Sequence, residues 1–427
     1  MEPVKSQRGR VPAPLRALLR IGGLSAGEVG SYWKEERQAL RRGLSAILLT
    51  AVTGMIAGLT LAAAEETLER LPGLLLLVPA AIDMRGNIYG ALASRLSTAL
   101  HIGTYDLGLR RRSFMGRQVE ATTLLTIGTS VIIAIFAYVF GVAFGLDPIP
   151  IWKLVVIATV GGVTASAFLL VVTIVLSWVA QRRDWNMDDV GAPTVTVFGD
   201  ILTVPALLLA AMIVDYEMVS VLLGIGLALV GLWALISGWI HADQVVRRIV
   251  RESVVPLALA AAVGAMAGTI LEVRIEEWIA APVLLIMIPS FIANCGSLGG
   301  ILSSRLASKL HLGLIEPRVL PGRLAALDIS VVFFFATFAF TAIGLSAWTA
   351  ASIFGYEPPG LGAVVGLSLV AGLISTILLS VVAYATAAAS YHFGFDPDNE
   401  GIPIVTSAMD LLGLLTLVAV TALLWGG

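Results

Sequence analysis

The chain is poor in charged residues and nearly devoid of cysteine and histidine. Only 13% of its 427 residues are Asp, Glu, Lys or Arg, and it contains one cysteine and four histidines. A single cysteine excludes an intrachain disulfide. The lack of any Cys or His cluster argues against a dedicated zinc or copper site. The net charge of −2 identifies no partner, and nothing in the sequence indicates a nucleic-acid role.

The chain is instead rich in hydrophobic residues. Hydrophobic residues make up 58% of the chain, and many apolar stretches have the length of about 20 residues that crosses a bilayer. We therefore predict an all-α polytopic protein integral to the plasma (cell) membrane. The first 43 residues are polar and basic and show no apolar core followed by a small-residue cleavage site, so we expect no signal peptide.

Eleven transmembrane spans are predicted between charged or Pro/Gly punctuation. Five lie in the first half, five repeat them in the second half, and one between the halves has no counterpart. In chain order they cover about 44–64, 71–100, 118–145, 153–180, 194–214, 218–240, 254–274, 281–310, 327–353, 361–389 and 403–424.

Charged residues at the span ends predict the orientation. One side of the membrane collects arginines: Arg37, Arg41, Arg42, Arg110, Arg111, Arg112, Arg117, Arg182, Arg183, Arg247, Arg248, Arg251, Arg318 and Arg323. The other collects acids: Glu65, Glu66, Glu69, Asp147, Asp215, Glu217, Glu272, Glu276, Glu277 and Glu357. The excess of positive charge on cytoplasmic loops then places the N-terminus in the cytoplasm and the C-terminus outside.

The two halves of the chain superimpose without a gap at an offset of 210 residues. PAAIDMRGNIYGALASRLSTALHIG (79–103) overlays PSFIANCGSLGGILSSRLASKLHLG (289–313), and APTVTVFGDILTVPALL (192–208) overlays IPIVTSAMDLLGLLTLV (402–418). After five spans the chain is on the opposite side of the membrane from where the first repeat began. The unpaired span crosses once more, so that the second repeat starts on the same side as the first. We therefore predict two parallel five-helix repeats related by a pseudo-two-fold axis along the membrane normal, plus one linker helix.

This repeat predicts four segments. A cytoplasmic N-terminal segment, partly an amphipathic helix in APLRALLRIGGL (13–24), is followed by the first repeat, the linker helix and the second repeat. The corresponding ranges are 1–43, 44–214, 215–252 and 253–427.

Asp200 and Asp410 are lone acids in long apolar segments, at equivalent positions of the repeat. A charge inside a bilayer is costly, so an intramembrane acid indicates a functional site. Two carboxylates held close together repel each other, and a divalent cation between them removes the repulsion. Mg²⁺ fits best, because it keeps several waters and needs only one or two carboxylates. Mn²⁺ and Co²⁺ are alternatives, since oxygen ligands discriminate these ions poorly.

Other oxygen ligands accompany the aspartates. Thr196 and Thr406 precede them by four residues and share their helix face; they either hold the water shell of the ion or bond back to their own helices. Near the cytoplasmic side, a further set forms either an acidic mouth that concentrates cations or an ordinary solvated loop: Asp188, Asp189, Asp398 and Asn399.

The second span of each repeat carries a proline followed seven residues later by a glycine. Interrupted helices expose backbone oxygens that can line a cation path, although kinking and close packing explain the same pattern. Asn87 and Ser297 follow the two glycines and add side-chain oxygens to the predicted path. The proline and glycine pairs are Pro79/Gly86 and Pro289/Gly296.

Two charges in the first repeat have no counterpart. Asp83 and Arg85 stand where the second repeat has Ala293 and Cys295, and we expect them to form a local ion pair.

The repeated segments of the chain resemble the MgtE-like membrane domain of the solute carrier 41 magnesium transporters. The resemblance rests on GNIYGALASRLSTALHIG (86–103), PTVTVFGDILTVPALL (193–208) and their second-half copies. It implies that the ion-binding aspartate of the family's fifth span corresponds to Asp200 and Asp410. It also implies a fused pseudo-dimer that works as a monomer, with the lipid bilayer and a divalent cation as its partners. The cytoplasmic and CBS domains of MgtE are not expected here, nor is gating by them.

The sequence leaves two alternatives to simple magnesium flow open. Coupled exchange against Na⁺ or H⁺ needs a titratable or Na⁺-binding group beyond the pair, and Asp83 is the candidate. An intramembrane aspartyl protease is a remote possibility, suggested by Gly199-Asp200 and the following Pro-Ala-Leu. Such enzymes need a GxGD stretch, however, and residue 197 is Val. We therefore expect a transporter and not an enzyme.

Overall fold

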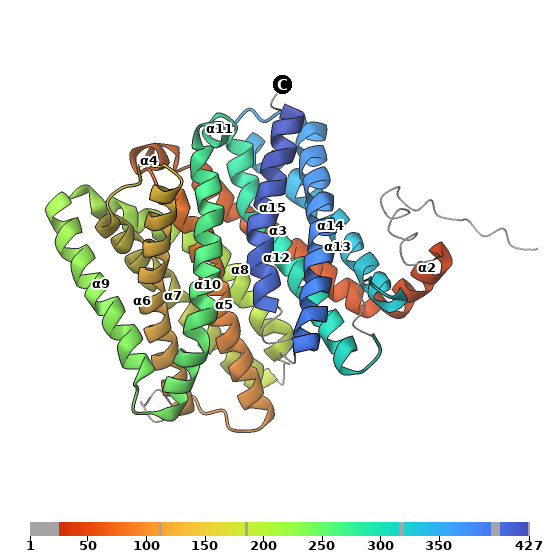
Figure 1. Cartoon of the computed structure of the whole chain (residues 1–427), viewed down its shortest axis with the longest axis horizontal. Coiled ribbons are helices and arrows are strands. Elements are labelled where there is room, and N and C mark those ends of the chain that lie inside the picture. Colours follow the sequence, from red (N-terminus) through yellow and green to blue (C-terminus); the bar gives the residue numbers. More distant parts are fainter. Residues whose placement is uncertain are drawn as a thin grey trace, which may run out of the picture.

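The computed structural model describes residues 25–108, 110, 113–183, 187–315, 320–393 and 402–425, and all regular structure in these ranges is helical (Figure 1). Within them, ten helices are long and apolar enough to cross a membrane. The predicted class, an all-α polytopic membrane protein, is confirmed. The predicted amphipathic helix at 13–24 lies outside the described residues.

The long helices follow the predicted order. After α2 (Ala26–Glu35), the first repeat comprises α3 (Arg37–Ala62), α4 (Glu65–Arg70), α5 (Leu74–His101), α6 (Phe114–Ala143), α7 (Ile151–Arg183) and α8 (Met187–Ala211). The turn η1 (Met212–Asp215) and α9 (Glu217–Trp239) connect it to the second. The second repeat comprises α10 (Gln244–Val273), α11 (Ile275–Ala280), α12 (Pro282–His311), α13 (Arg323–Ile353), α14 (Leu361–Phe393) and α15 (Ile402–Trp425).

The helix α5 corresponds to the second predicted span, 71–100, which is the one predicted span of the eleven that is not among the ten apolar helices. It has 28 residues, enough to cross a bilayer. The charged residues Asp83, Arg85 and Arg95 lower its hydropathy. It nevertheless packs inside the bundle against α6, α7, α8 and α10.

Helix boundaries recur at the offset of the sequence repeat. The short helices α4 and α11 begin and end 210 residues apart, as do α7 and α14. The turns after α5 and α12 both contain a glycine with positive φ, Gly103 and Gly313, and those after α6 and α13 contain Gly145 and Gly355. Only glycine adopts this conformation without steric cost. Figure 1 shows α4 and α11 at the same end of the bundle, as parallel repeats require.

The repeats exchange their first helices. The helix α3 packs along α12 of the second repeat, and α10 packs along α5 of the first. Glycines make the contacts close: a Cβ at Gly58 would collide with the backbone of Ile286, and a Cβ at Gly268 would collide with that of Leu76. The two glycines are 210 residues apart, and so are the two residues that they contact. Small residues let membrane helices approach each other at their backbones, so these contacts hold the repeats together.

The linker helix α9 lies at the edge of the bundle (Figure 1). Only 22% of its apolar stretch is buried inside the protein, against 78% for α12. The next helix, α10, begins at Gln244, because Asp243 accepts hydrogen bonds from the backbone of Val245 and Val246. The predicted boundary between residues 252 and 253 therefore falls inside α10.

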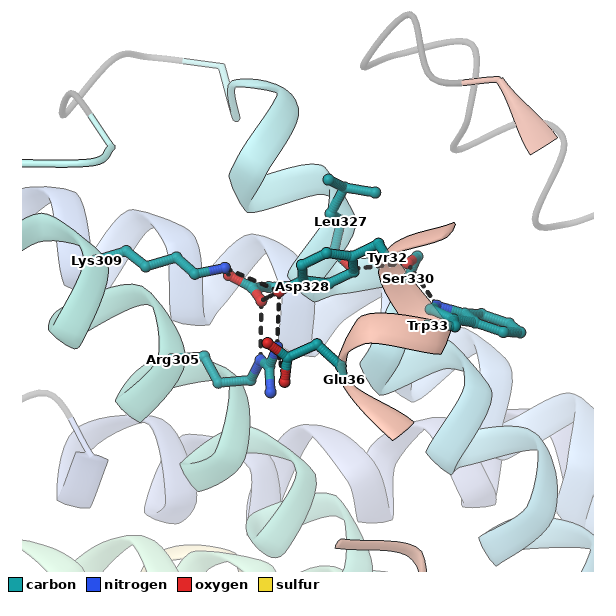
Figure 2. A network of polar contacts seen from close by, with 8 residues as sticks. All are labelled: Tyr32, Trp33, Glu36, Arg305, Lys309, Leu327, Asp328 and Ser330. Atoms are coloured by element: carbon teal, nitrogen blue, oxygen red, sulfur yellow. Dashed lines mark hydrogen bonds and ion pairs between the residues drawn. The ribbon is translucent and has the colours of Figure 1, made fainter. Parts of the chain in front are cut away.

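The N-terminal helix α2 is held on the second repeat by a polar network (Figure 2). Asp328 of α13 is fully buried and accepts hydrogen bonds from Arg305 (2.8 Å), Lys309 (2.7 Å) and the Tyr32 hydroxyl (2.8 Å). In the first repeat, the corresponding pair is Arg95 with the neutral Gln118 (2.7 Å). Residue 309 also has an alanine counterpart at position 99. Of the charges that receive α2, Asp328 and Lys309 thus exist in the second repeat only.

Candidate functional site

One cavity lies between the second and the last long helix of each repeat, which are α5 and α8 in the first repeat and α12 and α15 in the second. Its volume is about 240 Å³. Its lining consists of Val78, Pro79, Ile82, Asp83, Gly86, Asn87, Thr196, Asp200, Leu271, Ile288, Pro289, Ile292, Ala293, Gly296, Ser297, Gly300, Thr406 and Asp410. Both predicted aspartates, both threonines, both proline and glycine pairs, Asn87 and Ser297 are in this set.

The two aspartates are buried side chains on the cavity wall. Asp200 is 4% exposed and Asp410 is 7% exposed. The Oδ2 atom of Asp200 has no hydrogen-bond partner among the described residues. A buried carboxylate oxygen without a partner is costly, and a cation or its water shell in the cavity would supply the missing interaction.

Glycines shape the wall next to the carboxylates. A Cβ at Gly296 would lie 3.3 Å from Oδ1 of Asp410, so the bare backbone of α12 gives that carboxylate room. A Cβ at the equivalent Gly86 would meet nothing within 4 Å, because it would enter the cavity. The predicted interruption of these helices is wrong, because α5 and α12 continue as single α-helices through Pro79 and Pro289. Both nevertheless present their Pro-to-Gly stretch to the cavity.

Asp83 is a third carboxylate of the cavity, and the expected ion pair with Arg85 is wrong. Asp83 accepts a hydrogen bond from Nδ2 of Asn87 at 3.0 Å, whereas Arg85 donates through Nη1 to the carbonyl oxygen of Ala81 at 2.6 Å. The two side chains leave α5 in different directions because they are two residues apart on a helix. Pro79, Asp83 and Asn87 recur every four residues, and this spacing could have placed Asp83 on the cavity face.

The structure does not test the predicted acidic mouth. Asp188 and Asp189 belong to the first turn of α8, but their side chains are not described. Asp398 and Asn399 lie outside the described residues.

The oxygen-lined cavity is wide. No three side chains of His, Cys, Asp or Glu in the described part of the chain come close enough to hold a bare metal ion together. The volume of about 240 Å³ far exceeds the roughly 30 Å³ that a liquid water molecule takes up. Carboxylates, hydroxyls and an amide around such a space can hold an ion through its water molecules.

A second cavity of about 410 Å³ lies beside α4 and α11. Three of its lining residues are acidic: Glu69, Glu272 and Glu276. The Glu272 carboxylate of α10 accepts hydrogen bonds from the backbone of Gly73 (2.6 Å) and Leu75 (3.2 Å) at the start of α5. Glu272 therefore caps a helix of the opposite repeat.

Comparison with known families identifies the repeated unit. The model of the MgtE family, described as a divalent cation transporter, matches residues 78–210 and again residues 288–420. These segments also start 210 residues apart and together span more than half of the chain.

Two relatives match along most of the chain. Solute carrier family 41 member 3 of Rattus norvegicus is 24% identical over 402 residues, which cover 89% of this chain and 86% of the relative. Solute carrier family 41 member 2 of Homo sapiens is 26% identical over 398 residues, which cover 84% of this chain and 65% of the relative. No solved structure matches the chain.

Proposed function

This chain belongs to the MgtE family of divalent cation transporters, and we propose that it carries Mg²⁺ across the membrane through the cavity between its two repeats. Asp200 and Asp410 hold a largely hydrated ion there, and Thr196, Thr406, Asn87 and Ser297 bind its water molecules. One observation carries the proposal: oxygen-bearing residues from four helices, most of them at equivalent positions of the two repeats, line one cavity.

The chemistry of the lining favours a hydrated magnesium ion. Mg²⁺ dehydrates reluctantly and is held by few carboxylates, often through water. The cavity supplies carboxylate, hydroxyl and amide oxygens and has room for water. Mn²⁺ and Co²⁺ accept the same ligands, so the relative flux of these ions belongs to the test.

The membrane potential supplies enough energy for uptake. A divalent ion that moves inward through −100 mV gains about 4.6 kcal/mol. Uptake therefore needs no coupled ion, and efflux does. Asp83 favours coupled exchange as the second candidate, because it adds a titratable carboxylate to the cavity beyond the symmetric pair.

The test is Mg²⁺ flux into proteoliposomes. Asp200→Asn and Asp410→Asn remove one charge each at nearly constant volume, and we expect each to lower flux at least about tenfold, as loss of a charged hydrogen-bonding group in a buried site does. Asp147→Asn is the matched control, since it removes an exposed carboxylate between α6 and α7. Wild-type flux in both cavity variants would refute the proposed site, provided that all proteins elute as single species in detergent.

A further inference from the structure

Arg85 is a buried cation that the proposed ion path does not use. Its side chain is 2% exposed, in the middle of α5. Its Nη1 donates to the carbonyl oxygen of Ala81 at 2.6 Å, and its Nε has no partner among the described residues. A guanidinium does not lose its charge in a protein, and a buried charge without a counter-ion is expensive. An ionisable residue kept at this cost inside a membrane indicates a function.

The first repeat has a space built for this guanidinium. Nη2 of Arg85 and Oγ of Ser130 occupy the volume next to Gly162 where any side chain at that position would lie. The second repeat fills the equivalent volume without charge: Phe340 lies against Gly372, and Cys295 takes the place of Arg85. The first repeat thus holds a cationic side chain, Arg85, at a place where the second repeat has the uncharged residues Cys295 and Phe340.

The guanidinium stands directly behind the cavity wall. Its neighbours Asp83 and Gly86 line the cavity. A Cβ at Gly199, the residue before Asp200, would lie 3.9 Å from Cβ of Arg85. A charge on the far side of α5 is separated from an ion in the cavity by about one helix diameter, roughly 10 Å. At that distance and an effective dielectric constant of about 20, the repulsion of a divalent ion corresponds to a change in affinity of more than tenfold.

We propose that Arg85 tunes the affinity of the site: it weakens cation binding in the cavity and so permits release. This inference rests on the proposed function. The cavity holds three carboxylates, and Arg85 reduces their formal charge to the value that one divalent ion neutralises. A transport site must bind strongly enough to load and weakly enough to unload, and a fixed positive charge behind the wall adjusts that balance without occupying the path.

The chain itself offers the neutral variant. Arg85→Cys combined with Ser130→Phe copies the packing of Cys295 and Phe340 and removes the charge without leaving a hole. Isothermal titration with Mg²⁺ in detergent should give a dissociation constant at least about tenfold lower than that of the wild type. In proteoliposomes, the KM for Mg²⁺ should fall and the maximal flux should also fall, because release slows. Arg85→Lys keeps a basic group at this position, and its dissociation constant should lie nearer to that of the wild type than the constants of the neutral variants do.

Arg85→Gln is measured alongside, so that the conclusion does not depend on the folding of one variant. An unchanged or higher dissociation constant in the neutral variants that elute as single species overturns the inference. Asp200→Asn separates this result from failure of the proposed function. If Asp200→Asn binds Mg²⁺ like the wild type, both proposals fall. If it loses binding while the neutral variants keep the wild-type constant, only the role of Arg85 falls.

Discussion

The three carboxylates of the cavity have different surroundings, although two of them occupy equivalent positions. Asp410 lies against the bare backbone at Gly296, whereas Asp200 has an oxygen without a partner among the described residues. Asp83 is paired with Asn87, and the second repeat has Ala293 and Ser297 at those positions. The site is therefore two-fold in its aspartate pair and asymmetric in its remaining polar groups.

This asymmetry allows a test of coupling at Asp83. If the transporter exchanges Mg²⁺ for Na⁺ or H⁺, Asp83→Asn should abolish the acceleration of Mg²⁺ flux by an imposed Na⁺ or pH gradient. Flux down the Mg²⁺ gradient should persist, because Asp200 and Asp410 remain. The measurement is flux into proteoliposomes with and without each gradient, with Asp147→Asn as the control. Wild-type flux that ignores both gradients would instead support channel-like flow, and complete loss in Asp83→Asn would make Asp83 part of the ion site.

At the scale of elements, the contacts between exchanged helices decide how the repeats join. The glycines of α3 and α10 bring their backbones against α12 and α5, the two helices that present their Pro-to-Gly stretches to the cavity. The width of the cavity thus depends on close packing behind its walls. A side chain at these glycines would push a cavity wall inward or separate the repeats.

Substitution of these glycines should therefore destabilise the protein. Gly58→Leu and Gly268→Leu would collide with the backbone of Ile286 and Leu76, which no rotamer can relieve. Overpacking of this kind costs about 1–3 kcal/mol, so the unfolding temperature in detergent should fall in both variants. Gly226→Leu is the control, because that glycine lies exposed on α9 with nothing within 4 Å. An unfolding temperature that stays at the wild-type value in both Gly58→Leu and Gly268→Leu would contradict the packing described.

At the scale of the whole molecule, the parallel repeats place related elements on the same side of the membrane. Figure 1 shows α4 and α11 at one end of the bundle and the connection between α5 and α6 at the other. Glu65, Glu66, Glu69, Glu276 and Glu277 belong to α4 and α11 at the first end. Arg110 lies in the connection between α5 and α6 at the second end, and Arg117 lies in the first turn of α6. We propose that the first end faces outward.

Labelling of single cysteines tests this topology. Glu66→Cys of α4 and Glu277→Cys of α11 are exposed and should react with an impermeant maleimide on intact cells. Asp106→Cys in the connection between α5 and α6 should react only after permeabilisation. The native Cys295 is buried and supplies the background. Labelling of Glu66→Cys and Glu277→Cys from opposite sides would make the parallel arrangement wrong.

Light scattering of the purified protein tests its assembly. One chain supplies both repeats around the cavity, so we expect light scattering of the flux-active protein in detergent to give the mass of a single chain. A stable dimer whose cavity residues meet across the contact between chains would contradict this.

Local properties of the chain were enough to predict the class of protein, the order of its spans and the equivalence of Asp200 and Asp410. The length of an apolar segment directly indicates whether it can cross a membrane. An internal repeat is found by aligning the two halves of the sequence. The helix extensions at Arg37 and Gln244 were missed, because polar residues continue those helices beyond the apolar runs.

Tertiary packing alone decided where the side chains of neighbouring residues go. Asp83 and Arg85 were expected to pair, yet one lines the cavity and the other lies behind its wall beside Gly162. Similarly, no local pattern revealed that α3 and α10 cross to the opposite repeat or that α2 rests on Asp328. The direction in which a helix presents each face depends on the helices packed around it. That information is distributed over residues hundreds of positions apart, so it appears only when the chain is folded.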